Sequence, residues 1–145
     1  MLFRSEIVEA RIALECLMAQ RAAERFSTSD KNELKRVLRE MRAAVRRGDR
    51  AAYSDCNRLL HRRIAEISHH GVATALVENL RHRSGAHRFR SALVSDRPAA
   101  SLTEHVAIVN AIVANDGPGA AVAMATHLQF VIGALRDSDI LISRR

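Results

Sequence analysis

The sequence predicts an all-α fold, an antiparallel bundle of about six helices. Apolar residues recur at three- and four-residue spacing along nearly the whole chain, which is the period of a helix with one buried face. Only six glycines and two prolines interrupt this pattern, and neither the alternation typical of strands nor an internal repeat is found. With 145 residues, 48% of them hydrophobic, the chain is long enough to bury one core. We therefore expect a single domain over residues 1–145.

The first three helices are delimited by capping and breaking residues. A first helix is expected at about residues 3–26. The polar cluster at residues 27–30 offers N-cap side chains for a second helix, which Gly48 ends. A third helix is expected at about residues 50–68, and it is broken by two histidines and a glycine at 69–71.

The fourth and fifth helices are separated by a loop that contains a proline. The fourth is expected from about residue 72, through an arginine-rich stretch, to about residue 94, and the loop covers residues 95–98. The fifth is expected at residues 102–115. Ser101 precedes it and Glu104 lies three residues further on, so this pair predicts a capping box.

The last two helices are expected to form a hairpin. A tight Asp-Gly-Pro-Gly turn at residues 116–119 separates the fifth helix from a sixth at about residues 120–136. The tail beyond the sixth helix is expected to fray.

An excess of basic residues raises the question of nucleic-acid binding. The chain has 23 lysines and arginines against 16 acidic residues, which gives a formal net charge of +7. Binding of single strands usually needs aromatic stacking platforms, but there is no Trp, one Tyr and four Phe. The arginines are spread over all the expected helices instead of forming one stripe. Part of the positive charge is therefore better explained as a field that attracts a small anion.

Features of other protein classes are missing from the sequence. Cys16 and Cys56 are too far apart for a zinc finger, and they are expected to be free thiols in a reducing cytoplasm. The first 15 residues are charged throughout and do not form a signal sequence. No apolar run approaches the length of a membrane span. We therefore expect a cytoplasmic protein without a membrane partner.

Three of the seven histidines are expected on inward, apolar helix faces. His61 lies on the third helix, with Asn57 one turn earlier on the same face. His105 precedes Gly117 by 12 residues and His127 follows it by 10, which places them about 18 Å and about 15 Å from the turn. An antiparallel hairpin would bring both imidazoles to nearly the same level. If the third helix packs against it, Asn57, His61, His105 and His127 can form a transition-metal site.

A simpler interpretation of these histidines stays open. A lone histidine on an apolar face is more often a hydrogen-bonded core residue than a metal ligand. Three on inward faces, two of them level across a hairpin, give the metal site equal weight.

The order of these motifs resembles a known family. An opening helix with Arg-x-x-x-Glu is followed by Asn-x-x-x-His, then by a histidine on each of the last two helices. The matching stretches are EARIALECLMAQRAAERFS, LLHRRIAEISHH and LTEHVAIVNAIVANDGPGAAVAMATHL. This pattern resembles the ligand-sensing C-terminal domain, the FCD domain, of GntR-family bacterial transcriptional regulators, and it covers essentially the whole chain.

The resemblance implies a fold, a metal and an effector. The fold would be an antiparallel bundle of six or seven helices, and the protein would be a homodimer. Metal-containing members bind a divalent ion through an Asp or Asn and three histidines, here Asn57, His61, His105 and His127. Small carboxylate effectors reach the open positions of the metal, and an arginine of the first helix, here Arg11, often lines the same cavity.

The sequence departs from the family pattern in two ways. Asn57 replaces the commoner acidic ligand, and the nearby Asp55 faces about 200° away on a helix. A neutral amide is a weak ligand for Mn²⁺ or Mg²⁺, so Zn²⁺ or Ni²⁺ is the expected cofactor. The sequence contains no counterpart of the family's winged-helix DNA-binding domain. In the family that domain contacts DNA, so we expect no DNA contact through residues 1–145. The chain is expected to be either an expressed fragment or a naturally truncated relative.

Three arginines are the candidate effector-binding residues: Arg11, Arg81 and Arg88. The forked guanidinium of Arg11 suits the oxygens of a small organic acid. A salt bridge between Arg11 and Glu15, one turn later, is an equal alternative.

The expected function is therefore an effector-binding and dimerisation domain and not an enzyme. A metal-dependent hydrolase is one alternative, but it needs a general base, and Glu104 points about 100° away from its neighbour His105. A metal-free helical interaction module with structural histidines is the other alternative.

Overall fold

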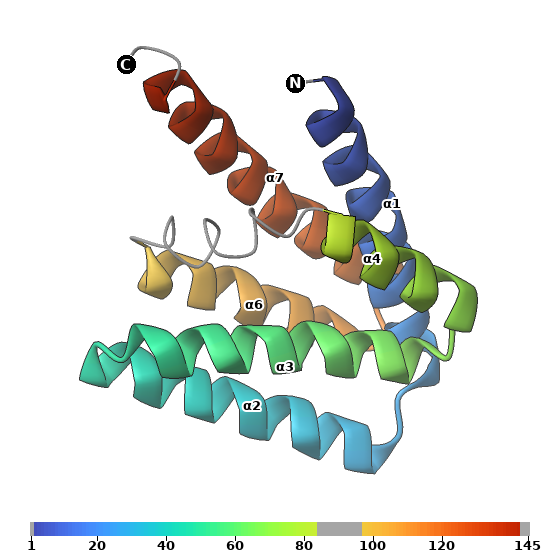
Figure 1. The fold of residues 1–145 in the computed structure, drawn as a ribbon. Coiled ribbons are helices and arrows are strands. Elements are labelled where there is room, and N and C mark those ends of the chain that lie inside the picture. Colours follow the sequence, from blue (N-terminus) through green and yellow to red (C-terminus); the bar gives the residue numbers. More distant parts are fainter. Residues whose placement is uncertain (1, 84–96, 143–145) are drawn as a thin grey trace.

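The computed structural model describes residues 2–83 and 97–142, and these residues form six α-helices and no strand. In chain order the helices are α1 (Leu2–Arg25), α2 (Thr28–Arg47), α3 (Arg50–Ser68), α4 (Gly71–Arg83), α6 (Pro98–Val113) and α7 (Gly117–Ile142) (Figure 1). The prediction of an all-α bundle is confirmed.

The helices are arranged around α1 and the α6–α7 hairpin. α1 packs along α7 and also contacts α3, α4 and α6. α2 packs against α3 and α6, and the three helices run side by side in Figure 1. α4 packs on α1. Side chains from α1, α3, α4, α6 and α7 can therefore approach one another inside the bundle.

The main core lies where α1, α2, α3, α6 and α7 meet. Fully buried alanines on α1, among them Ala19 and Ala22, let the neighbouring helices approach closely. The largest fully buried apolar side chains come from the four other helices: Leu34, Met41, Leu60, Ile64, Ile108, Ile112 and Met124. No helix of the described segments is long and apolar enough to cross a membrane.

The ends of α2 and α3 agree with the sequence prediction. The Oγ of Ser27 accepts a hydrogen bond from the backbone N–H of Asp30 at 3.1 Å, and the Asp30 carboxylate accepts one from the backbone N–H of Ser27 at 2.8 Å. α2 ends at Gly48, whose φ of 66° is left-handed and suits glycine. His69 ends α3 with a φ of 49°.

The predicted start of the fifth helix is wrong by four residues. α6 begins at Pro98. Proline suits this position because the first residue of a helix donates no hydrogen bond within the helix. Ser101 and Glu104 consequently lie inside α6 and do not form the predicted capping box. Their side chains are available for contacts with α3 and α7, which are described below.

The predicted turn of the last hairpin is displaced toward the N-terminus. α7 begins at Gly117, because the Asp116 carboxylate accepts a hydrogen bond from the backbone N–H of Gly119 at 2.9 Å. The turn falls on residues 114–116, where Asn115 has a φ of 57°. α7 also continues to residue 142, past the predicted end near residue 136.

The second half of the predicted fourth helix is not tested. α4 ends at Arg83, and the predicted helical residues 84–94 lie outside the described residues. The same holds for Arg88, one of the three arginines that the sequence offers to an effector.

Candidate functional site

Three histidines from three helices converge inside the bundle. His61 of α3, His105 of α6 and His127 of α7 each place a ring nitrogen within 4.8 Å of the other two. The centroids of the His105 and His127 rings are 4.2 Å apart, so the two imidazoles lie level across the hairpin. The His61 ring lies 5.5 Å from His105 and 5.4 Å from His127. His105 and His127 are buried and His61 is partly buried.

The outer nitrogens of two of these rings are held by hydrogen bonds. His105 Nδ1 lies 3.2 Å from the hydroxyl of Tyr53, which itself donates to Ser101 Oγ at 2.9 Å. His127 Nδ1 lies 2.7 Å from a carboxylate oxygen of Glu104. The Nε2 atoms of both rings are not used by these outer hydrogen bonds. His105 Nε2 lies 3.4 Å from His61 Nε2.

The amide oxygen of Asn57 is buried and has no hydrogen-bond partner. Asn57 lies one turn before His61 on α3, so both residues are on the same side of that helix. A buried polar atom without a partner is rare and costs free energy, which makes this oxygen a candidate metal ligand. Asp55 is exposed and forms an ion pair with Arg58. This agrees with the expectation that Asp55 faces away from Asn57.

A buried ion-pair network joins α1 to α4 beside the cluster. Glu15 is only 2% exposed, and its carboxylate accepts a hydrogen bond from Arg81. Arg11 lies 3.6 Å from the second oxygen of Glu15, so the alternative salt bridge is present in the structure. The Nε–H of Arg11 is buried without a hydrogen-bond acceptor. Arg11 therefore retains an unsatisfied donor despite its ion pair.

The surroundings keep two of the imidazoles neutral. Burial lowers the pKa of His61 well below its ordinary 6.5, and the neighbouring charges of His127, Arg81 and Arg11 lower it further. Burial likewise lowers the pKa of His105 well below 6.5, with contributions from His127 and His61. Burial also raises the pKa of Tyr53 to about 12, so its hydroxyl stays protonated. Neutral imidazoles are the form that binds a metal.

The depressed pKa values predict that the protein, kept in EDTA, loses stability in acid. Unfolding lets His61 and His105 take up protons below pH 6.5, whereas the folded protein does not bind them until the pH reaches its lower pKa values. Their contribution is fully present above pH 6.5 and falls below it, by at most about 1.4 kcal/mol per pH unit for each imidazole. Urea unfolding between pH 8 and pH 5 measures this slope. A profile identical to that of a His61→Gln, His105→Gln double variant would contradict it.

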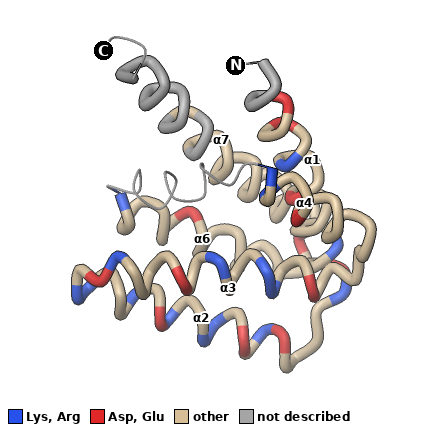
Figure 2. The backbone as a smooth tube through the Cα atoms, viewed as in Figure 1, with Lys and Arg blue, Asp and Glu red and all other residues tan. Residues whose placement is uncertain are grey.

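The charges on the surface are intermixed and locally paired. Figure 2 shows basic and acidic residues interspersed along α2 and α3. Arg36 contacts both Glu33 and Glu40, and Arg63 contacts both Glu33 and Glu66. The sequence prediction that the positive charge forms no single stripe therefore holds for the described helices.

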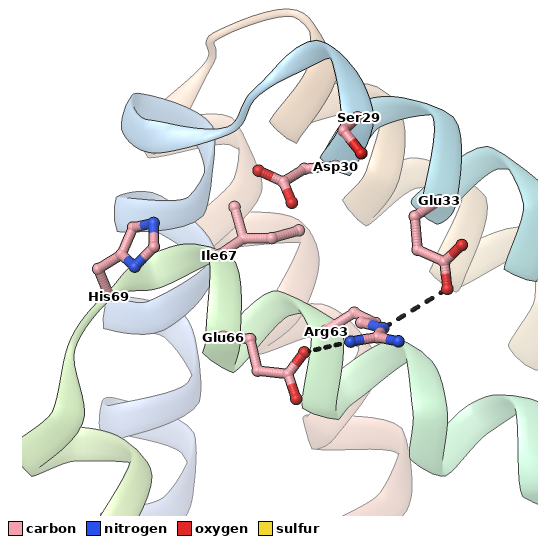
Figure 3. A pocket seen from close by; sticks show the side chains of 7 residues that line it. All are labelled: Ser29, Asp30, Glu33, Arg63, Glu66, Ile67 and His69. Atoms are coloured by element: carbon pink, nitrogen blue, oxygen red, sulfur yellow. Dashed lines mark hydrogen bonds and ion pairs between the residues drawn. The ribbon is translucent and has the colours of Figure 1, made fainter.

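A surface groove of about 390 Å³ lies between the start of α2 and the end of α3 (Figure 3). Arg63 lies in it between Glu66, at 2.6 Å, and Glu33, at 3.5 Å. These charges offset one another. None of the three clustered histidines lines this groove, so it is separate from the candidate site.

Sequence reasoning missed the residues that surround the histidine cluster. The sequence predicts a capping box for Ser101 and Glu104, and it gives no role to Tyr53. One signal could have found Glu104: it lies within one helical turn of the level of His127 across the hairpin. No comparable signal in the sequence pairs Glu15 with Arg81, because the two are 66 residues apart.

The fold and the sequence together define a known class of helical domains. A family model for the FCD domain matches residues 6–130, and the chain belongs to this family. It is 28% identical to the HTH-type transcriptional repressor RspR of Escherichia coli (strain K12), over 87% of this chain and 55% of that protein. It is 30% identical to the putative L-lactate dehydrogenase operon regulatory protein of the same strain, over 92% of this chain and 52% of that protein.

A solved structure has the same fold. Escherichia coli McbR/YncC matches with a TM-score of 0.83 and 24% identity, over 92% of this chain and 68% of that chain. The present chain spans about half the length of the two E. coli relatives. The expected resemblance to GntR-type regulators is confirmed, and the relatives are transcriptional regulators.

Proposed function

We propose that this chain is the effector-binding and dimerisation domain of a cytoplasmic bacterial GntR-type regulator, and that it binds a small carboxylate at a divalent metal. The observation that carries the proposal is the convergence of three histidines beside an unpartnered arginine donor. Membership of the FCD family supports the general role. The metal and the class of effector rest on the side chains described above.

The donor set fits a transition metal. We propose Asn57, His61, His105 and His127 as the ligands, because three imidazole nitrogens lie close together and the amide oxygen of Asn57 is buried without a partner. Imidazole suits Zn²⁺ and Ni²⁺, whereas Mg²⁺ and Mn²⁺ prefer carboxylate and carbonyl oxygens. A neutral amide in place of a carboxylate strengthens this preference. The bound metal would act as a Lewis acid that attracts an anionic effector.

The effector is proposed to be an anion because of the arginines beside the cluster. Arg11 and Arg81 both contribute to the lowered pKa of His61, so their positive charges act on the cluster. Arg81 already donates to Glu15, while Arg11 has an unsatisfied Nε–H. We therefore assign Arg11 as the principal contact for a carboxylate and Arg81 as a supporting charge. Arg88 remains a candidate outside the described residues.

An effector bound at this position would change the packing of the helices in the bundle. The candidate residues come from α1, α3, α4, α6 and α7, so one ligand would change the balance of contacts among five helices. We propose that two copies associate, which a light-scattering mass of about twice 16.1 kDa would support. DNA would be bound by a separate winged-helix domain, as the resemblance implies.

A thermal-shift screen of small mono- and dicarboxylates, with and without EDTA, tests the proposal. A saturating effector at about 100 times its Kd stabilises the folded state by about 2.7 kcal/mol, and EDTA is expected to abolish this gain. Arg11→Gln is expected to abolish it too. Arg21→Gln, which alters an exposed arginine on the same helix, is the matched control and should respond like the parent.

Two outcomes would contradict this function. Stabilisation that is insensitive to both EDTA and Arg11→Gln would show that carboxylates bind elsewhere. Turnover of a carboxylate ester or amide would instead favour the hydrolase alternative.

A further inference from the structure

We propose that Glu104 is a positioning residue for the metal: it fixes the tautomer of His127 and supplies negative charge to an otherwise neutral set of ligands. This inference rests on the proposed metal site and names a residue that acts on the metal through another residue. Glu104 immediately precedes His105 on α6, and its side chain, which contacts His127 of α7, is 15% exposed.

The geometry determines which nitrogen of His127 has the proton. The Glu104 carboxylate oxygen lies 2.7 Å from His127 Nδ1, which is a strong hydrogen bond. An ionised carboxylate can only accept, so Nδ1 must be the protonated nitrogen. A neutral His127 then has its free electron pair on Nε2. A carboxylate in this position also makes the imidazole a stronger metal ligand.

The charge of the site explains why a carboxylate is needed here. Three neutral imidazoles and one amide leave the double charge of the metal without compensation. Glu15 is engaged by Arg81 and Arg11. Among the described residues, Glu104 is the carboxylate that forms a hydrogen bond with a ring of the histidine cluster. It can therefore partly offset the metal charge through the ring of His127.

Tyr53 provides an internal comparison, because it holds His105 without a charge. The Tyr53 hydroxyl donates to Ser101 at 2.9 Å, so its oxygen is free to accept the Nδ1–H of His105 at 3.2 Å. Both rings are thus oriented in the same way, one by a neutral hydroxyl and one by a carboxylate. Tyr53→Phe removes the hydrogen bonds to Ser101 and His105 without changing the charge, whereas Glu104→Gln keeps a hydrogen-bond acceptor and removes the charge.

Zinc affinity, measured by competition with a chromophoric chelator, tests the role of the charge. Glu104→Gln is expected to bind zinc about 10–100-fold more weakly than the parent protein, and Glu104→Ala more weakly still. Glu9→Gln, which removes an exposed carboxylate from α1, is the matched control and should stay within twofold. Glu104→Gln affinity within threefold of the parent would overturn the proposal.

The tautomer gives a second readout that does not need bound metal. Nitrogen-15 NMR of EDTA-treated parent protein at pH 8 is expected to show His127 protonated at Nδ1. The Glu104→Ala variant is expected to show a mixture of the two tautomers, and folded spectra verify that the variant is intact. An Nε2-protonated His127 in the parent protein would overturn the assignment. A parent protein that binds no zinc but has the expected tautomer would refute the proposed metal site and the charge role of Glu104, while leaving the orientation of His127 established.

Discussion

A His105→Ala variant is expected to bind zinc or nickel more than a hundredfold more weakly than the parent protein. His105 is fully buried, and its Nε2 lies at the centre of the cluster, 3.4 Å from His61 Nε2. Loss of a direct ligand should cost more than the roughly 10–100-fold that loss of an outer hydrogen-bond partner costs. Elemental analysis after purification without chelator, followed by zinc titration in competition with a chelator, measures the change.

Stability with and without zinc separates this effect from simple loss of packing. His105→Ala leaves a cavity and removes the ring nitrogen that forms a hydrogen bond with Tyr53, so the metal-free variant is itself expected to be less stable. In the parent protein, zinc at about 100 times its Kd should add about 2.7 kcal/mol, and in the variant it should add little. His82→Ala removes an exposed imidazole and should keep the full gain. If zinc stabilises the metal-free His105→Ala variant as much as it stabilises the metal-free parent protein, the proposed metal site is refuted.

Helix periodicity and capping residues were sufficient to predict most of the fold. The limits of α2 and α3 follow from Ser27, Gly48 and His69, whose effects are local in the chain. The start of α6 was missed because Pro98 and the alanines after it begin a helix as well as Ser101 does. Local propensity allowed both starts, and packing of the first turn of α6 selects between them.

The level of the two hairpin histidines could be predicted despite the error in the turn. Placing the centre of the turn at Asn115 puts His105 ten residues before it and His127 twelve after it, so the difference in level stays at two residues. The estimate depends only on the rise per residue of two antiparallel helices. Partners such as Glu104 and Arg81 depend on helix tilt and on side-chain reach, which periodicity does not specify.

Replacement of Glu15 by alanine is expected to destabilise the protein by about 3 kcal/mol. Glu15 is 2% exposed and holds Arg81, while Arg11 lies 3.6 Å from its other oxygen. Without the carboxylate two like charges are left without their buried partner, and α4 loses an ion pair that joins it to α1. Removing one partner of a buried pair costs about 3–5 kcal/mol, and the lower value applies because Arg81 is 30% exposed.

Urea unfolding of matched variants separates the buried charge from the loss of a side chain. Glu24→Ala removes an exposed glutamate of α1 that is paired with Arg21, and it should change the midpoint little. A Glu15→Leu, Arg81→Met double variant removes both partners of the buried pair and should recover more than half of the loss, because apolar side chains can replace such a pair. Equal losses for Glu15→Ala and Glu24→Ala would contradict the prediction. Full loss in the double variant would instead show that Glu15 acts mainly on Arg11, whose free Nε–H is the donor proposed for the effector.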